Sequence, residues 1–432
     1  MFGEFTIYLP LVAMLALLAI GVPVAFSMAI PGALGLYFLF GEAQFTAILS
    51  TVAHNETAVY IYTTIPMFIL MAEFINESGL TKEIFTAAQR WLGHVPGGLA
   101  IATTVANGGF AVLSGSSVAA AATMSSISVP EMRRYGYKDT MAMGTVSAAG
   151  TFAAMLPPSL TLIVYGIWTR TSIGALFIAG ILPGLLTLLG YIAVILVWTK
   201  LDPDVAGERQ SYSWGERFGS LKPIWPAVII VTLVLGGLYT GAVTAVEAGA
   251  VGAAGAFLMG VVFVDMGIGD TNIAVREAAQ TSTMIFFIVI GAVIFTSYMA
   301  FSGLTNELVS IISGLPIGGL GVVVLMLAIY VFLGTFMDQI AVLILTIPIT
   351  YPLFVNQLGY SPIWFGIVLV KTVEIGLVTP PLGMNVYIAA SQVDVDISDA
   401  FRGAAMFLIV DAILLAGLIA FPEIATWLPT VL

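Results

Sequence analysis

Long apolar segments fill most of this sequence, and they constrain its fold more than any other feature. About 20 apolar residues are enough for a helix to cross the hydrocarbon core of a bilayer. Charged residues make up only 9% of the 432 residues, whereas soluble domains contain about 25%. We therefore predict an all-α polytopic membrane protein. The predicted spans lie at 3–20, 23–40, 58–78, 140–166, 172–199, 223–240, 243–265, 278–301, 362–391 and 400–422.

The composition argues against several classes of function. The net charge of −11 disfavours a nucleic-acid partner. The chain has no cysteine, which excludes disulfides, thiolate chemistry and cysteine-ligated metals. Its two histidines, His54 and His94, do not form the H-E-x-x-H motif of metalloproteases. No nucleophile and base stand at a catalytic spacing, so we do not expect an enzyme.

Two further apolar stretches, 97–129 and 318–352, are too long for one helix and break in the middle. If each enters and leaves the membrane on the same side as a re-entrant hairpin, nearly all basic residues fall on one side. The positive-inside rule makes that side the cytoplasm, so both termini are predicted to be periplasmic. Arg170 falls on the other side and Lys371 within a span. The basic residues on the cytoplasmic side are Lys82, Arg90, Arg133, Arg134, Lys138, Lys200, Arg209, Arg217, Lys222, Arg276 and Arg402.

An internal repeat relates the two halves of the chain at an offset of about 223 residues. The first copy begins with an inward span at 58–78, and the second begins with an outward span at 278–301, so the copies are inverted. Inverted repeats that contain broken helices are typical of secondary transporters, which bind substrate near the bilayer midplane. The matching anchors are 78–83 with 302–307, 96–99 with 317–320, and 156–158 with 379–381.

The repeat divides the chain into four parts. Residues 1–57 hold scaffold spans and a surface helix, and residues 201–277 hold a cytoplasmic loop and further scaffold spans. The first inverted repeat is 58–200 and the second is 278–432. Each contains a hairpin and a helix that a Pro-Pro pair interrupts, and the first also contains an amphipathic arm at 81–94. These broken helices are predicted at 140–166 and 362–391.

Four interruptions at midplane depth offer oxygen atoms for ligands. The hairpin tips carry hydroxyls and a carboxylate, and each proline break leaves backbone carbonyls without helical partners. Such oxygens suit a desolvated alkali cation, while the half-helix N-termini beyond the breaks suit an anionic group. The simpler alternative is that the prolines only kink helices and the small residues only pack them closely. The residues that we select are Ser114, Gly115, Ser116, Ser117, Pro157, Ser159, Thr335, Asp338 and Thr379.

Ionisable residues inside spans are costly and usually functional. Asp338 is predicted to coordinate a cation or to take part in a gate. The alternative is that it caps the tip's own N–H groups. Lys371 and Glu374 are three residues apart and share a helix face, so they either neutralise one another or leave Lys371 to bind an anionic substrate. Glu73 and Asp411, like Glu247, lie near predicted span edges, where a solvated or packing role is expected.

Several motifs, taken in order, make the chain resemble the large membrane subunit (M subunit, DctM-like) of tripartite ATP-independent periplasmic (TRAP) transporters. The resemblance covers nearly the whole chain. The motifs are IPMF at 65–68, SGS at 114–116, LPPS at 156–159, LFIAGILPG at 176–184, FMD at 336–338 and EIGLVTPPLGMN at 374–385.

The resemblance implies a sodium-coupled importer of the bacterial inner membrane that works by an elevator mechanism. The hairpins and broken helices would slide as a transport domain against a scaffold of the remaining spans. The implied partners are a small four-span membrane subunit, a periplasmic binding protein, membrane lipid and a small carboxylate or sulfonate substrate. Na⁺ is the coupling ion, and no other cofactor is expected.

On this resemblance we place one sodium ion at each hairpin and its break. Ser114, Gly115 and Ser116 would bind one ion near Pro157. Thr335 and Asp338 would bind the other near Thr379. The substrate is predicted to lie between the tips, with Ser117, Ser159, Lys371 and Asn385 as its contacts.

Two other functions remain as alternatives. A stand-alone sodium symporter of the divalent-anion type shares the hairpins, broken helices and inverted repeats but needs no binding protein. A channel or assembly scaffold would show no coupled transport.

Overall fold

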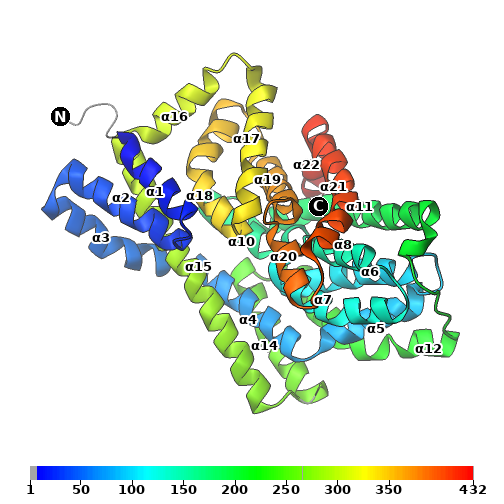
Figure 1. Cartoon of the computed structure of the whole chain (residues 1–432). Coiled ribbons are helices and arrows are strands. Elements are labelled where there is room, and N and C mark those ends of the chain that lie inside the picture. The colour runs from blue at the N-terminus through cyan, green and yellow to red at the C-terminus, as the bar shows by residue number, and fades with distance from the viewer. Residues whose placement is uncertain (1–6, 265, 432) are drawn as a thin grey trace.

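This structure, a computed structural model, describes residues 7–264 and 266–431. The described residues form helices joined by turns, with no strand (Figure 1). Eight helical segments among them are long and apolar enough to cross a membrane. The predicted all-α polytopic fold is confirmed. Residues 3–6 of the first predicted span and residue 265 of a later one lie outside the described residues.

One group of helices, the peripheral bundle, is built around the long helix α15. α15 packs along α2 and α4, and α14 also packs against α4. α2 and α15 approach closely because Gly291 has no side chain: a Cβ there would lie 2.3 Å from the carbonyl oxygen of Ala25. The bundle consists of α1 (Leu9–Ala19), α2 (Val24–Phe40), α3 (Glu42–Thr57), α4 (Thr64–Glu77), α13 (Trp225–Tyr239), α14 (Ala245–Phe263) and α15 (Ile268–Ser302).

Both predicted hairpins are present. The first reverses at Gly115, whose φ of +60° is a conformation that glycine adopts easily. The second reverses at Met337 and Asp338. The first hairpin extends five residues beyond the predicted end at 129, and the second continues into a π-helical turn at Pro352–Gln357. The hairpin helices are α6 (Gly98–Ser114) with α7 (Ser117–Arg134), and α17 (Gly318–Phe336) with α18 (Gln339–Tyr351).

Both predicted broken helices are also present. The first is interrupted at 150–151 and again at 156–159, and the second at 379–383. The most apolar part of the first lies entirely inside the protein, where irregular backbone is tolerated at membrane depth. The segments are α8 (Asp139–Ala149), α9 (Phe152–Met155) and α10 (Leu160–Thr169) in the first, and α19 (Pro362–Val378) and α20 (Met384–Ser391) in the second.

The order of helices is the same in the two halves of the chain. Each half has a first helix (α4 or α15), a short arm, a hairpin, a broken helix and a final long helix. The hairpins come from opposite ends of the molecule: the α16–α17 turn lies at the top of Figure 1, and α5 and α12 lie near the bottom. Inverted repeats predict this arrangement. The additional helices are α5 (Leu80–Leu92), α11 (Ile173–Leu201), α12 (Trp214–Gly219), α16 (Leu304–Ser313) and α21 (Ile397–Ala420).

α11 and α21 pack against the hairpins and broken helices, although the resemblance assigns them to the scaffold. α21 packs on α8, α19 and α20, while α11 contacts α6, α9, α19 and α21. The cause is a close crossing, because a Cβ at Gly144 of α8 would lie 2.4 Å from the carbonyl carbon of Gly403 in α21. We call α6–α11 and α17–α21 together the core bundle.

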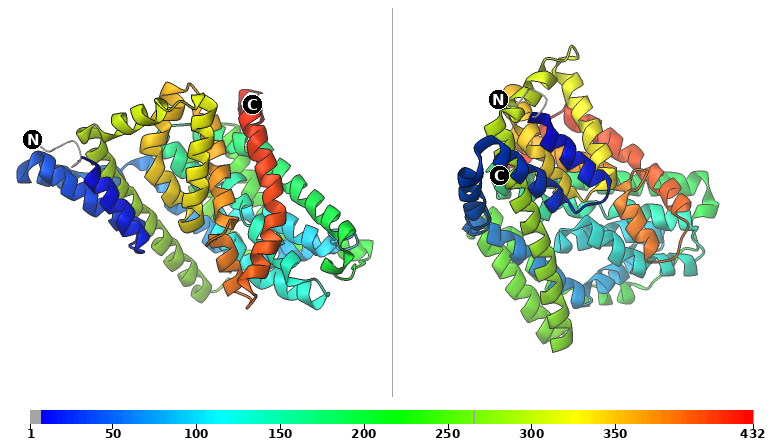
Figure 2. Two further views of the ribbon diagram at one scale, coloured as in Figure 1. Left: turned by 45° about the horizontal axis from the view of Figure 1, so that its top comes forward. Right: turned by 60° about the vertical axis from the view of Figure 1, so that its left-hand side comes forward.

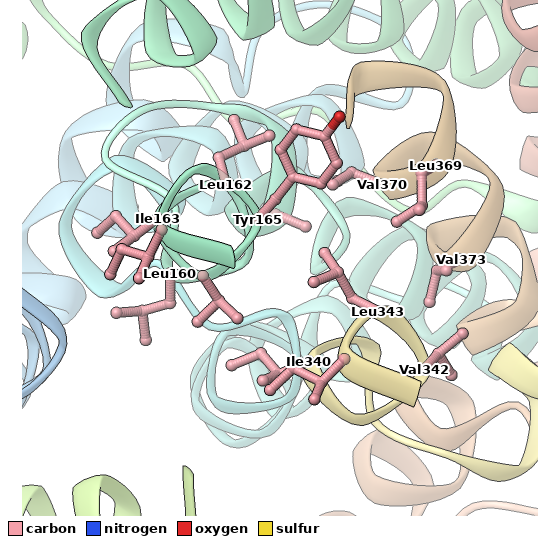
Figure 3. Close-up of a cluster of buried hydrophobic side chains, with 14 of the residues drawn as sticks. Leu160, Leu162, Ile163, Tyr165, Ile340, Val342, Leu343, Leu369, Val370 and Val373 are labelled. Atoms are coloured by element: carbon pink, nitrogen blue, oxygen red, sulfur yellow. The ribbon is translucent and has the colours of Figure 1, made fainter. Parts of the chain in front are cut away.

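The two repeats share one apolar core. Side chains of α10, α18 and α19 meet there, as the labelled residues in Figure 3 show. Tyr165 of α10 lies in this cluster, and its hydroxyl donates a hydrogen bond to the carbonyl oxygen of Pro362 at the start of α19 (2.6 Å). The half-helix beyond the first break is therefore fixed to the second broken helix.

Most segments that carry the basic residues gather at one end of the molecule. The indole N–H of Trp91 donates to the carbonyl oxygen of Arg217 (3.0 Å), which joins α5 to α12. Arg133 donates to the carbonyl oxygen of Val393 (3.0 Å), which joins α7 to the α20–α21 turn. Arg276 lies in the first part of α15. The remaining short helices are at Tyr60–Thr63, Pro203–Val205, Lys222–Ile224 and Glu423–Val431, the last being α22.

Candidate functional site

A cavity of about 500 Å³ lies where the two hairpin tips meet. The core bundle supplies one wall from both tips and from the first residues of both half-helices. The peripheral bundle supplies the other wall from α4 and α15. Its lining includes Ser114, Gly115, Ser116, Val118, Ala119, Leu160, Asp338, Gln339, Ile340 and Met384 from the core, and Ile69, Ala72, Glu73, Asn76, Thr281, Met284 and Ile285 from the other wall.

Four helices begin at this cavity: α7, α10, α18 and α20. The first N–H groups of a helix have no intrahelical partner and carry partial positive charge. Side chains satisfy one such N–H in three of these helices: Ser116 in α7 (3.4 Å), Ser159 in α10 (3.2 Å) and Asp338 in α18 (2.9 Å). α20 follows Gly383 and has no side-chain cap. These helix N-termini direct partial positive charge toward the cavity, whose lining also contains the carboxyl groups of Asp338 and Glu73.

The first hairpin tip touches the first proline break. The carbonyl oxygen of Gly115 accepts a hydrogen bond from the N–H of Leu160 (3.4 Å). A Cβ at Gly115 would lie 3.1 Å from the carbonyl oxygen of Pro158. The hydroxyl of Ser114 is buried and has no hydrogen-bond partner. The structure thus brings the predicted tip residues beside the break that contains Pro157.

The second tip is joined to the second broken helix by a glycine contact. A Cβ at Gly376 of α19 would lie 2.7 Å from the Cα of Gly334 in α17, and Thr335 is the next residue of α17. The hydroxyl of Thr335 donates to the carbonyl oxygen of Phe332 (2.8 Å). The hydroxyl of Thr379 donates to the carbonyl oxygen of Ile375 (2.6 Å). Both hydroxyl oxygens keep lone pairs for a ligand.

Asp338 is the carboxylate that lies at the tip and lines the cavity. Its Oδ1 accepts the N–H of Ile340 (2.9 Å), which is the capping role that the sequence left as an alternative. A carboxylate has about four acceptor positions. Capping therefore leaves acceptor positions available for a cation.

Three of the four predicted substrate residues lie beside the breaks or the first tip, next to residues that line the cavity but not in its lining. Ser117 and Asn385 are buried, and neither the Ser117 hydroxyl nor either amide atom of Asn385 has a hydrogen-bond partner. Ser159 is different: its hydroxyl donates to the carbonyl oxygen of Ala154 (2.5 Å) and caps α10. Unpaired buried polar groups are unfavourable, so Ser117 and Asn385 are the better candidates for ligand contacts.

Lys371, the fourth predicted substrate residue, belongs to a buried ion cluster that lies outside the cavity lining. Its ammonium lies 2.7 Å from Oδ1 of Asp411 and 3.1 Å from Oε2 of Glu374, and all three side chains are buried. The expected pairing with Glu374 is confirmed. Asp411 was expected near a span edge in a solvated or packing role. It is instead a buried ion-pair partner of Lys371, because α21 packs on α19.

Comparison with known proteins identifies the family. Residues 11–424 match the family described as tripartite ATP-independent periplasmic transporter, DctM component. The chain belongs to this family. The C4-dicarboxylate TRAP transporter large permease protein DctM of Pseudomonas aeruginosa is 32% identical over 373 residues, which cover 86% of this chain and 85% of the relative.

Other similarities support the DctM assignment. The isethionate TRAP transporter permease protein DctMQ of Oleidesulfovibrio alaskensis is 30% identical over 439 residues, covering 100% of this chain and 65% of that protein. The crystal structure of the Alcanivorax borkumensis YdaH transporter aligns with a TM-score of 0.61 and 14% identity over 94% of this chain and 96% of that one. That likeness shows a shared fold.

The cavity of this DctM protein includes residues that sequence reasoning missed. Glu73 was expected to be solvated or to pack, but it lines the cavity from α4 together with Asn76. Thr281 of α15 and Gln339 of α18 also line it, and Oε1 of Gln339 is buried without a partner. Gln339 follows Asp338 at the tip, which was the available signal. The others come from helices outside the hairpins, and of these only Glu73 carried a local signal, as an ionisable residue within a predicted span.

A second cavity, of about 710 Å³, lies toward the other ends of α4 and α15. It is lined by Tyr62 just before α4, by Val293 of α15 and by the α10–α11 turn, which includes Arg170. The tip cavity, in contrast, borders the second half of α4 and the first half of α15. The two cavities are therefore displaced in opposite directions along the same pair of helices.

Proposed function

We propose that this DctM component is the permease of a sodium-coupled importer that moves a small organic anion by an elevator mechanism. One observation carries the proposal: two hairpin tips and two half-helix N-termini converge on one cavity between the core and peripheral bundles. Related permeases are named for C4-dicarboxylate and isethionate. The substrate class is accordingly a carboxylate or a sulfonate.

Sodium coupling rests on the oxygen atoms near the tips. Sodium is a hard cation and prefers such ligands. The first site would use Ser114, Gly115 and Ser116, where a buried hydroxyl has no partner and backbone carbonyls of the break are close. The second would use Thr335, Asp338 and Thr379. The Asp338 carboxylate makes the second site the stronger one.

Substrate binding rests on the positive ends of the helices that begin at the cavity. An anion there is stabilised by uncapped N–H groups of α20 and by the aligned dipoles of α7, α10 and α18. Ser117 and Asn385 lie in the first turns of α7 and α20. Their unpaired polar atoms would bind the carboxylate or sulfonate oxygens.

The elevator mechanism rests on the displaced cavities. If the core bundle slides along α4 and α15, the tip site moves from one end of these helices toward the other. In the predicted topology the tip cavity lies nearer the cytoplasmic ends, and the cavity with Arg170 lies nearer the periplasm. The structure would then represent an inward-displaced state.

The protein is proposed to reside in the bacterial inner membrane with both termini in the periplasm. A small four-span membrane subunit would pack on the exposed apolar face of the peripheral bundle, next to lipid. A periplasmic binding protein would deliver the substrate. Since such a protein selects the substrate first, the permease cavity requires only chemistry common to small organic anions.

Uptake in proteoliposomes tests the proposal. The permease, its small subunit and its binding protein are reconstituted and given a panel of radiolabelled carboxylates and sulfonates under a sodium or a potassium gradient. We expect saturable uptake of at least one anion that requires sodium and the binding protein. Uptake without the binding protein would support the stand-alone symporter instead. Non-saturable flux that needs no ion gradient would support the channel.

A further inference from the structure

The ion cluster around Lys371 joins three helices inside the core bundle. Lys371 and Glu374 are on α19, Asp411 is on α21, and Thr187 and Tyr191 are on α11. Each of these side chains is buried. The cluster lies outside the lining of the tip cavity. The proposed transport mechanism does not use it.

The hydrogen bonds are distributed unevenly between the two carboxylates. Asp411 accepts the Lys371 ammonium (2.7 Å to Oδ1) and the Tyr191 hydroxyl (2.9 and 2.8 Å to its two oxygens). Glu374 accepts only the ammonium, through Oε2 (3.1 Å). Its other oxygen, Oε1, is buried and has no partner. The third bond of the ammonium goes to the Thr187 hydroxyl (3.4 Å).

The cluster is one positive charge short if both carboxyl groups are ionised. One ammonium then faces two carboxylates, and a net negative charge is buried in the protein. A buried charge without a partner is strongly unfavourable, because it has lost its hydration and no opposite charge replaces it. Something must therefore supply the missing charge.

Neighbouring helices do not supply that charge. α9, α10, α17, α18 and α20 all pack on α19 and contain no charged side chain. α11 and α21 also pack on α19, and their other cations, Lys200 and Arg402, are exposed. Glu423 of α22 is exposed. The nearby tyrosines are engaged elsewhere or exposed: Tyr165 donates to the Pro362 carbonyl, Tyr330 donates to Thr350 and Tyr387 faces outward.

A proton fits the position better than a metal cation. The ammonium already occupies the space between the two carboxylates and would repel a second cation there. A metal ion would also need several oxygen ligands, whereas Oε1 of Glu374 has no polar neighbour within hydrogen-bond distance. A proton neutralises the group without a ligand shell.

We propose that Glu374 is a proton-binding site and that the folded protein holds one proton on Oε1 of this side chain. Asp411 stays ionised, because it receives both the ammonium and the tyrosine hydroxyl. The cluster is then neutral: one ammonium, one carboxylate and one carboxylic acid. It joins α11, α19 and α21 within the core bundle without a buried net charge.

Infrared spectroscopy of the purified protein in lipid tests the proposal directly. A protonated carboxylic acid has a carbonyl stretch distinct from that of a carboxylate, and this band shifts when the protein is exchanged into D₂O. The variants are Glu374→Gln, which resembles neutral glutamate in shape, and Glu423→Gln as an exposed control. We expect the Glu374→Gln minus wild-type difference spectrum at neutral pH to show loss of an acid band. Glu423→Gln should show no such loss.

Thermal unfolding at several pH values provides a second readout. A proton bound only in the folded state stabilises it at low pH, and that stabilisation is lost as the pH rises. The wild type should therefore unfold at progressively lower temperatures than Glu374→Gln as the pH is raised. The proposal is overturned if the difference spectrum shows loss of a carboxylate band, or if Glu374→Gln does not fold while the wild type shows no acid band. Neither result would bear on sodium-coupled uptake.

Discussion

At the residue scale, Lys371 is the side chain whose loss should be most costly. Replacing it with methionine leaves Asp411 buried without its cation, and breaking a buried pair costs about 3–5 kcal/mol. We expect Lys371→Met to unfold at a much lower temperature in detergent, or to be recovered in low yield. Arg402→Met is the matched control, since Arg402 is an exposed cation on α21. Equal stability of the two variants would show that the cluster is not required for folding.

Ser159 and Asn385 should differ in what they support. Ser159→Ala removes the cap of α10, which costs about 1 kcal/mol, and is expected to lower stability as well as uptake. The side-chain amide of Asn385 has no hydrogen-bond partner, so Asn385→Ala should reduce uptake with a smaller loss of stability. Melting temperature and uptake rate measured on both variants separate these roles. A large stability loss in Asn385→Ala with normal uptake kinetics would remove it from the proposed site.

Site residues could be predicted from the sequence where the neighbouring residues marked them. Gly115 was identified at a hairpin tip because it lies among serines and permits a sharp reversal, and Asp338 because carboxylates are rare in the middle of apolar stretches. Asp411 could not be matched to Lys371, because the two are 40 positions apart and only the packing of α21 on α19 brings them together. Glu73 was misjudged for the same reason, since its cavity is formed by helices from three parts of the chain.

At the element scale, the crossing of α8 and α21 leaves no space for a side chain at the contact. A Cβ at residue 403 would lie 1.9 Å from the carbonyl oxygen of Thr140, a backbone atom. We expect Gly403→Ala to lower stability by about 1–3 kcal/mol through overpacking. Gly417→Ala on the same helix is the control, because its Cβ would meet only a side chain at 3.7 Å. Similar melting temperatures for both variants would contradict the close crossing.

Helix positions were largely predictable because proline, glycine and charge mark where apolar segments end. The interruptions at 156–159 and 379–383 follow from the Pro-Pro pairs. The start of α15 was placed at 278, whereas the helix begins at Ile268. Residues 268–277 include Asp270, Arg276 and Glu277. Their charges lower the local hydropathy, so the predicted span begins later than the helix does. The assignment of α11 and α21 to the core bundle depends on tertiary contacts that hydropathy cannot report.

At the scale of the whole molecule, the elevator proposal predicts that the core bundle must move against α15. Cysteines at Ala119 of α7 and Met284 of α15 face the same cavity from the two bundles. Joining them with a bifunctional thiol reagent should abolish uptake. The chain has no native cysteine, so no background reaction is expected from it.

The control for this tether lies within the core bundle. Val194 of α11 and Val410 of α21 line one groove, and joining cysteines there should leave uptake largely intact. Full uptake after tethering positions 119 and 284 would contradict sliding of the two bundles.

The inverted repeat allowed the meeting of the hairpin tips to be predicted, because two inverted copies bring their tips to the same depth.

Sodium-dependent stability tests the central claim, that the hairpin tips bind sodium, most directly. The purified protein is unfolded by heating in sodium, potassium or choline chloride at equal ionic strength. A ligand that binds only the folded state stabilises it by about 2.7 kcal/mol at one hundred times its dissociation constant. We predict a saturable stabilisation by sodium alone. It should be reduced in Asp338→Ala and Asp338→Asn and retained in Glu423→Ala. Identical melting curves in the three salts, or an undiminished sodium shift in both Asp338 variants, would contradict sodium binding at these tips.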